Sequence, residues 1–116
     1  MRKRSSMYPD DETRLKHIID AAKEAIQFLG DMTFEELSKD RKTLQAIIRN
    51  IEIIGEASSK LTSDFRNKND QIPWGDIIGM RNWLAHGYFN VDVEHVWSTV
   101  KTDIPNLLKL LDSINT

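Results

Sequence analysis

Apolar residues recur three and four positions apart in four long segments of this chain, and this spacing constrains the fold more than any other feature. The segments cover residues 10–30, 40–61, 73–87 and 92–112. Such spacing places the apolar side chains on one face of a helix. A strand would instead alternate apolar and polar residues, a pattern that no segment keeps for more than a few positions. The sequence therefore predicts an all-α fold, an antiparallel bundle of four main helices.

Residues that can cap a helix stand where these segments begin and end. Thr33 and Glu36 have the spacing of a capping box, which predicts one further short helix to about Ser38. Glycine favours the backbone conformation in which helices end. The other predicted starts are Asp10 or Asp11, Asp40, Pro73 with Trp74, and Asp92, and the predicted ends are Gly30 and Gly87.

Two stretches depart from a regular bundle pattern. Residues 62–73, TSDFRNKNDQIP, read as a polar connection, which is long for a loop between two helices. Pro105 lies inside the last helical segment, and because proline has no backbone N–H it predicts a kink or break near Ile104.

The apolar positions also predict the core. We assign Trp74 and Trp97 to helix packing, and Trp83 either to an interface between two copies or to the core. The other inward residues of the last two long segments are predicted to be Ile77, Met80, Leu84, Val93, Val96, Val100, Ile104, Leu107, Leu108 and Leu111.

Composition narrows the classes of function. The chain has 116 residues, 40% of them hydrophobic, which fits a single domain over residues 10–116 after a disordered basic tail over residues 1–9. A formal net charge of -2 means that nucleic-acid binding would need a local basic cleft. The absence of cysteine excludes disulfides, zinc–thiolate sites and thiol nucleophiles. The polar N-terminus and the lack of a long apolar run predict a cytoplasmic protein without a membrane partner.

The stretch IIGMRNWLAHGYF, residues 77–89, holds the candidate site residues Arg81, Asn82, His86 and Tyr88. Asn82 and His86 are four apart and share a helix face, so the amide can orient the imidazole. Arg81 and His86 are five apart, which on a regular helix means about 140° of rotation and about 7.5 Å of rise. They can address one phosphate if the helix loosens at residues 85–87, or if two copies meet across a two-fold axis.

A histidine that titrates near neutral pH and a fixed cation are sufficient groups for cutting RNA. The imidazole of His86 can exchange protons with the ribose 2′-oxygen or the leaving 5′-oxygen, and Arg81 can stabilise charge on the phosphorane. His17 and His95 are isolated in the sequence, so we expect neither a metal nor a cofactor. The alternatives remain open at this point: an ordinary salt bridge for Arg81, a helix-end histidine for His86, and a surface aromatic, stacking or modification site for Tyr88.

Several blocks of the sequence resemble one known family. RNWLAHGY is similar to the Arg-x4-His-x-Tyr motif of the HepT-like toxins in the HEPN superfamily. DRKTLQAIIRNIEIIGEASSKL resembles the central helix of that family, IPWGDIIGMRNWLAHGYF its catalytic helix, and VDVEHVWSTVKTDIPNLLKLL its last helix. The likeness covers residues 12–112, nearly the whole chain.

The resemblance implies a HEPN-like bundle that forms a homodimer, with the motif lining a cleft between protomers, and a metal-independent endoribonuclease activity on tRNA or mRNA. Carried over by position, Arg81 and His86 would be catalytic and Asn82 would support them. It further implies an MntA-like nucleotidyltransferase antitoxin, which would neutralise the toxin of this type VII-like system by attaching AMP to Tyr88. Bulk and negative charge on Tyr88 would then compete with the RNA phosphate.

A second hypothesis is a non-catalytic subunit that binds substrate or nucleotide for a minimal nucleotidyltransferase, with Arg81 and Tyr88 as ligands. Glu56, in the block IIGEA, matches a recurrent block of the family. We expect it to have a structural role, pairing with Arg49 or Arg81.

Overall fold

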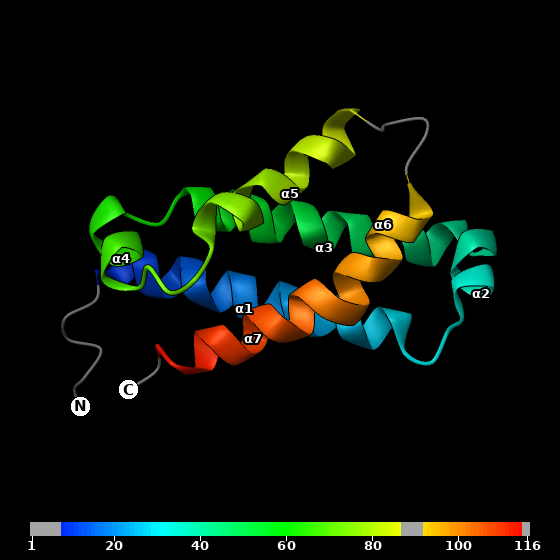
Figure 1. The fold of residues 1–116 in the computed structure, drawn as a ribbon, viewed down its shortest axis with the longest axis horizontal. Coiled ribbons are helices and arrows are strands. Elements are labelled where there is room, and N and C mark those ends of the chain that lie inside the picture. The colour runs from blue at the N-terminus through cyan, green and yellow to red at the C-terminus, as the bar shows by residue number, and fades with distance from the viewer. Residues whose placement is uncertain (1–7, 87–91, 115–116) are drawn as a thin grey trace.

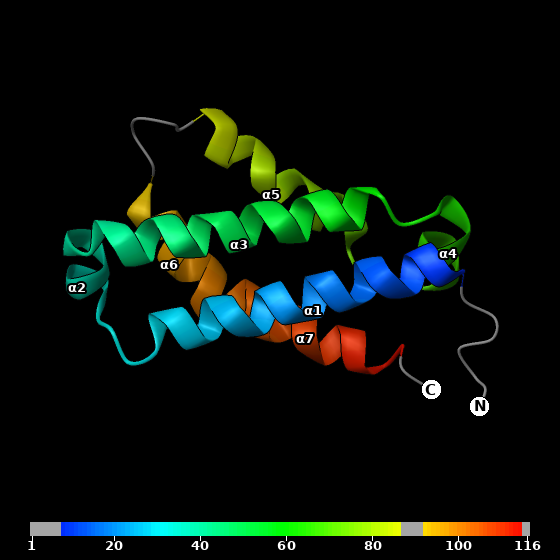
Figure 2. The ribbon, with the colours of Figure 1, turned by 180° about the vertical axis from the view of Figure 1, so that it is seen from behind.

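The computed structural model describes residues 8–86 and 92–114, without the side chains of residues 82–86. Every regular element in these ranges is helical, which confirms the predicted all-α fold. Figures 1 and 2 show the bundle from two opposite sides. In chain order the elements are α1 (Pro9–Leu29), α2 (Phe34–Lys39), α3 (Arg41–Ser59), α4 (Ser63–Lys68), α5 (Trp74–His86), α6 (Val93–Ser98), the π-helical segment η2 (Thr99–Asp103) and α7 (Ile104–Asp112).

The two longest helices, α1 and α3, run side by side along the molecule (Figure 2). α5 packs against α3, and the continuous path α6–η2–α7 crosses the other helices on the face that Figure 1 presents. The short helix α2 closes one end of the bundle next to α6, and α4 lies at the opposite end. Among the described helices none is both long and apolar enough to cross a bilayer.

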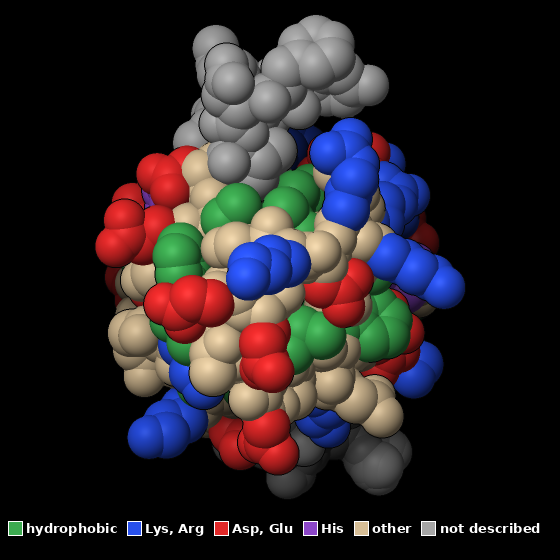
Figure 3. All heavy atoms as spheres, turned by 90° about the vertical axis from the view of Figure 1, so that its right-hand side faces the viewer, with side chains coloured by type: hydrophobic (Ala, Val, Ile, Leu, Met, Phe, Trp, Pro, Cys, Tyr) green, Lys and Arg blue, Asp and Glu red, His purple; other side chains and the backbone are tan. Residues whose placement is uncertain are grey.

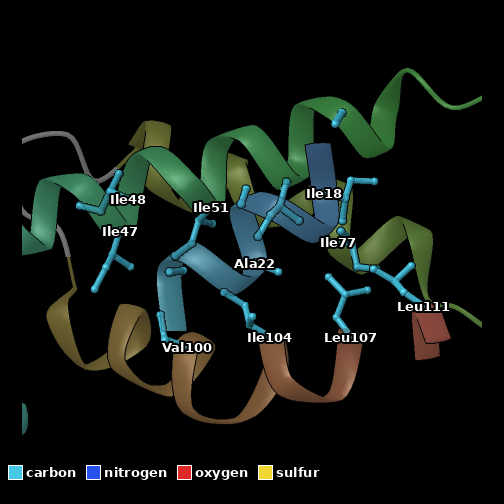
Figure 4. Close-up of a cluster of buried hydrophobic side chains, with 14 of the residues drawn as sticks. Ile18, Ala22, Ile47, Ile48, Ile51, Ile77, Val100, Ile104, Leu107 and Leu111 are labelled. Carbon is cyan, nitrogen blue, oxygen red and sulfur yellow. The ribbon is translucent and has the colours of Figure 1, made fainter. Parts of the chain in front are cut away.

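One cluster of buried apolar side chains joins these helices (Figure 4). Ile18 from α1, Ile51 from α3 and Ile104 from α7 are completely buried. Each side chain of this size contributes about 1.5–3 kcal/mol when it is fully removed from water. The cluster confirms the predicted core positions Trp74, Ile77, Val96, Val100, Leu107 and Leu111, while Met80, Val93, Trp97 and Leu108 are partly buried against it. Leu84 and Trp83 have side chains outside the described part of the chain.

Most of the predicted helix boundaries are confirmed. The Thr33 hydroxyl accepts a bond from the backbone N–H of Glu36 at 3.1 Å, and the Glu36 carboxylate accepts one from the N–H of Thr33 at 2.8 Å. Asp40 caps α3 by accepting the N–H of Thr43 at 3.0 Å, and this bond lowers the pKa of the Asp40 carboxyl. Asp92 caps α6. Gly30 ends α1 with a φ of 53°, a backbone conformation that suits glycine. Gly87 lies outside the described residues.

The predicted cap of α1 is wrong. The helix begins one residue earlier, at Pro9, with Tyr8 as N-cap. Proline is well suited to a first helical position because its fixed φ matches the helix and the backbone N–H that it lacks would have no partner within the helix there. Residues 1–7 of the predicted tail lie outside the described part of the chain.

Asp11 has a different role. It is completely buried, and its carboxylate accepts bonds from the backbone N–H of Thr62 at 2.8 Å and from the Thr62 hydroxyl at 2.6 Å. The same hydroxyl oxygen accepts the N–H of Phe65 at 3.1 Å and thereby caps α4. One carboxylate therefore fastens the start of α1 to the start of α4.

The connection predicted for residues 62–73 contains the helix α4, so the prediction of an irregular loop is wrong for its first half. Phe65 is the buried side chain of this short helix, and its ring lies 6.0 Å from the ring of Trp74. The indole N–H of Trp74 donates to the carbonyl oxygen of Asn69 at 3.1 Å. These contacts fix the point at which α5 begins.

Pro105 does not break the last helix, although the turn before it is irregular as predicted. Residues Thr99–Asp103 form a π-helical turn, and the N–H of Ile104 donates to the carbonyl of Thr99, five residues back. Proline cannot donate to the carbonyl four residues before it and its ring crowds that carbonyl. A wider turn accommodates both effects.

Candidate functional site

The helix α5 carries the candidate motif, and the apolar residues of its sequence WGDIIGMRNWLAH are spread over more than half of its circumference. A helix with so wide an apolar surface needs cover from more than one neighbour. In the described part of the chain α5 packs mainly against α3. Ile77 is buried, whereas Ile78 and Met80 are half-buried.

Arg81 is located where the helix α5 passes close to α3. A Cβ atom built on Gly55 of α3 would lie 3.4 Å from the Cβ of Arg81, and equally near the carbonyl oxygens of Ile77 and Ile78. Arg81 is half-buried. The role of Arg81 in chemistry stays a prediction.

α5 remains α-helical through His86. Asn82 and His86 are thus one helical turn apart, and the backbone at Ala85 and His86 is not loosened. On this regular helix Arg81 is turned about 140° away from His86. The side chains of Asn82 and His86, and the whole of Tyr88, lie outside the described residues. His86 is the last residue of the helix.

A groove of about 590 Å³ lies between the first half of α5 and the path α6–η2–α7. Carboxylates of Asp76 and Asp103 stand on its walls, and among the residues that line it there is no Lys or Arg. Its remaining lining residues are Pro73, Gly75, Ile77, Gly79, Met80, His95, Thr99, Asn106, Leu107 and Leu110. An RNA backbone would be repelled by these walls, so the groove is a poor path for RNA.

The charge distribution elsewhere is mixed. On the end of the molecule that carries α2, acidic and basic side chains are interspersed (Figure 3), so this face has no large patch of one sign. Among the side chains that the structure describes, in residues 8–81 and 92–114, no three from His, Asp or Glu lie close enough to hold a metal ion together.

Comparison with known proteins identifies the family to which this chain is related. The family model described as "Ribonuclease HepT-like" matches residues 18–114, from the middle of α1 to the end of α7. The chain belongs to the HepT-like ribonuclease family. The resemblance seen in the sequence blocks is thereby confirmed.

Individual members of the HepT-like family are similar over most of their length. "Putative RNase MJ0127" of Methanocaldococcus jannaschii is 42% identical, over 86% of this chain and 83% of that protein. "Probable ribonuclease HepT" of Thermococcus cleftensis is 44% identical, over 80% of this chain and 84% of that protein. "Putative RNase TTE0752" of Caldanaerobacter subterraneus is 38% identical, over 86% of this chain and 89% of that protein. No solved structure matches the chain.

Glu56 follows Gly55 in this HepT-like chain and is exposed. Its carboxylate pairs with Lys60 at 3.8 Å, and Arg49 pairs with Glu52 at 3.7 Å. The pairs suggested for Glu56, with Arg49 or Arg81, are not among the ion pairs of the described residues. Both members of each observed pair are exposed, so these contacts add little to stability.

Gly55 is the site-related residue that sequence reasoning missed. It was part of a family-like block, but no role was assigned to it. A glycine is an unfavourable residue inside a helix, and Gly55 interrupts a long run of apolar and helix-forming residues in α3. A glycine inside an otherwise strongly helical segment could have been read as a sign that another helix packs closely at this position.

Proposed function

We propose that this HepT-like chain is the toxin of a type VII-like toxin–antitoxin system, a cytoplasmic endoribonuclease that cuts RNA without a metal ion. The observation that carries the proposal is the order Arg81, Asn82, His86, Tyr88 at the end of α5, in a chain that belongs to a ribonuclease family. These residue types supply a proton acceptor, a fixed cation and an orienting amide at one helix end.

The chemistry follows from these groups. Neutral His86 accepts the proton of the ribose 2′-hydroxyl while the 2′-oxygen attacks the neighbouring phosphorus. The bond from phosphorus to the 5′-oxygen breaks, and that oxygen leaves with a proton from a protonated His86 or from water. Arg81 holds two phosphate oxygens and stabilises the extra charge of the phosphorane. The products are a 2′,3′-cyclic phosphate and a 5′-hydroxyl, and no metal or redox step is needed.

A homodimer would complete such a site. Arg81 and His86 are about 140° apart around one regular helix, and α5 has apolar residues on the side that α3 does not cover. A second copy packed on this side, across a two-fold axis, would bring two arginines and two histidines to one cleft. The acidic groove lies on the first half of α5, so RNA would approach from the end at which the helix carries His86.

Cleavage of RNA in the presence of EDTA tests this proposal. Purified protein is incubated with tRNA and with a labelled single-stranded oligoribonucleotide, once with EDTA and once with Mg²⁺. We expect the same products and similar rates in both conditions, with a cyclic phosphate at the new 3′ end, because the protons and charges are handled by side chains.

Two results would contradict the proposal in different ways. Cleavage that stops in EDTA would exclude the metal-independent mechanism. Binding of RNA or nucleotide without any cleavage would instead favour the alternative of a non-catalytic subunit of a minimal nucleotidyltransferase.

We further propose that a nucleotidyltransferase antitoxin attaches AMP to the hydroxyl of Tyr88. Tyr88 stands two residues after His86, so an added phosphate would carry its negative charge to the place where the RNA phosphate must bind. Co-expression with a small nucleotidyltransferase encoded beside this chain should raise the intact mass by one AMP residue or several and should abolish cleavage.

The matched control is Tyr88→Phe, which keeps the ring and removes the hydroxyl. This variant should keep the unmodified mass and remain active after co-expression. Tyr8 provides the control for a modification of any exposed tyrosine, because its side chain is exposed. AMP found on Tyr8 rather than Tyr88 would contradict the proposed switch.

A further inference from the structure

The position of α5 beyond its first turn depends chiefly on the contact with α3. The start of the helix is fixed by the contacts of Trp74 with Phe65 and Asn69, whereas the helix as a whole packs mainly against α3 and its first half borders a groove toward α6–η2–α7. A change in the spacing between α5 and α3 would therefore move Arg81 and the helix end that follows it.

Gly55 is the place where this contact is closest. A Cβ atom at this position would meet the Cβ of Arg81 and the carbonyl oxygens of Ile77 and Ile78, each at 3.4 Å. Two of these three atoms belong to the backbone of α5, so they cannot move aside by a change of rotamer. By contrast, Cβ atoms built on Gly75 and Gly79 of α5 would meet nothing within 4 Å.

We propose that Gly55 is a positioning residue for the ribonuclease reaction: a residue this small lets α5 lie close to α3 and so fixes where the end of α5, which carries Arg81 and His86, stands relative to the rest of the protein. This inference rests on the proposed function, because it assigns Arg81 to the reaction. Gly55 itself is buried and would touch neither RNA nor the reacting atoms.

The geometry predicts a sharp dependence on side-chain size. The methyl group of Gly55→Ala would lie at ordinary contact distance from α5, so this variant should keep kcat within about twofold of wild type. Gly55→Val adds two carbons to a Cβ that is already in contact with α5 on three atoms, so we expect it to push the helices apart. Because a displacement of about 1 Å in a catalytic group can cost up to about 100-fold in rate, we expect kcat of Gly55→Val to fall at least about tenfold.

The experiment measures kcat and KM separately on a labelled single-stranded oligoribonucleotide, together with thermal unfolding. Gly55→Val should lose kcat with little change in KM, and Gly75→Val, the control on α5 with open space, should lose neither. If Gly55→Val does not fold, Gly55→Ser replaces it, since its hydroxyl is one atom longer than the methyl group. A folded Gly55→Val or Gly55→Ser with the wild-type kcat would overturn the proposal.

A double variant separates positioning from a general structural effect. If Gly55 acts through the position of Arg81 and His86, the loss in the double variant Gly55→Val with Arg81→Ala should be smaller than the product of the two single losses in single-turnover cleavage with excess protein. A loss equal to that product would overturn the proposal even if both single variants are impaired. A wild-type protein without activity would contradict the proposed function itself, whereas an active wild type with an equally active Gly55→Val would contradict only the role of Gly55.

Discussion

Replacing His86 by alanine is expected to slow RNA cleavage by about 100- to 10,000-fold, because the variant loses the group that takes and returns a proton. The fold should be unaffected, since His86 is the last residue of α5 and lies beyond the contact of this helix with Gly55. Initial cleavage rates in EDTA and unfolding curves of both proteins measure the two effects.

His17→Ala is the matched control, because His17 is an exposed histidine on α1, far along the chain from the motif. It should cleave like wild type. Equal background cleavage by wild type and His86→Ala would show that the observed nuclease is a contaminant.

The wild-type rate should also fall on both sides of neutral pH, where the imidazole is either fully protonated or fully neutral. A flat profile would remove His86 from proton transfer.

The second large effect is expected for Arg81→Lys, with a loss of about 100-fold or more in kcat/KM. Lysine keeps the charge, but it presents one ammonium group instead of a planar fork and cannot hold two phosphate oxygens at once. The shorter reach matters at this position because the Arg81 Cβ lies against α3 and the side chain has to extend from there.

Arg49→Lys is the control for a general change from arginine to lysine. Arg49 is on α3, is largely exposed and pairs with Glu52 on its own helix. Its replacement should change neither rate nor stability measurably, in keeping with the small energies of exposed ion pairs. Near wild-type cleavage by Arg81→Lys would show that charge alone suffices at the site.

Local signals in the sequence were enough for most of the fold. Thr33, Glu36 and Asp40 act on backbone groups three residues away, so their roles can be read from spacing alone. Asp11 could not be read in this way because its partner Thr62 is 51 residues distant. A carboxylate in the first turn of a helix looks like a cap unless the tertiary contact is known.

At the candidate site, too, features that depend on nearby residues could be predicted and features that depend on distant residues could not. Arg81 and His86 were identified by residue type and spacing, and the helix through His86 agrees with the rotation between them. Gly55 was not identified, because its contribution is a missing side chain opposite another helix. Helix α4 was missed because fewer than two turns give too little periodicity to distinguish from a loop.

The π-helical turn before Pro105 has a consequence for the phase of the last helix. Val96, Val100 and Ile104 follow one another at intervals of four residues, and all three are buried. In a regular α-helix each interval of four overshoots a full turn by about 40°, so two of them would rotate Ile104 by about 80° from Val96. The wider turn absorbs part of this drift. The π-helical turn thereby corrects the rotation of the helix, so that buried residues at intervals of four, four, three and four all face one core. These residues are Val96, Val100, Ile104, Leu107 and Leu111.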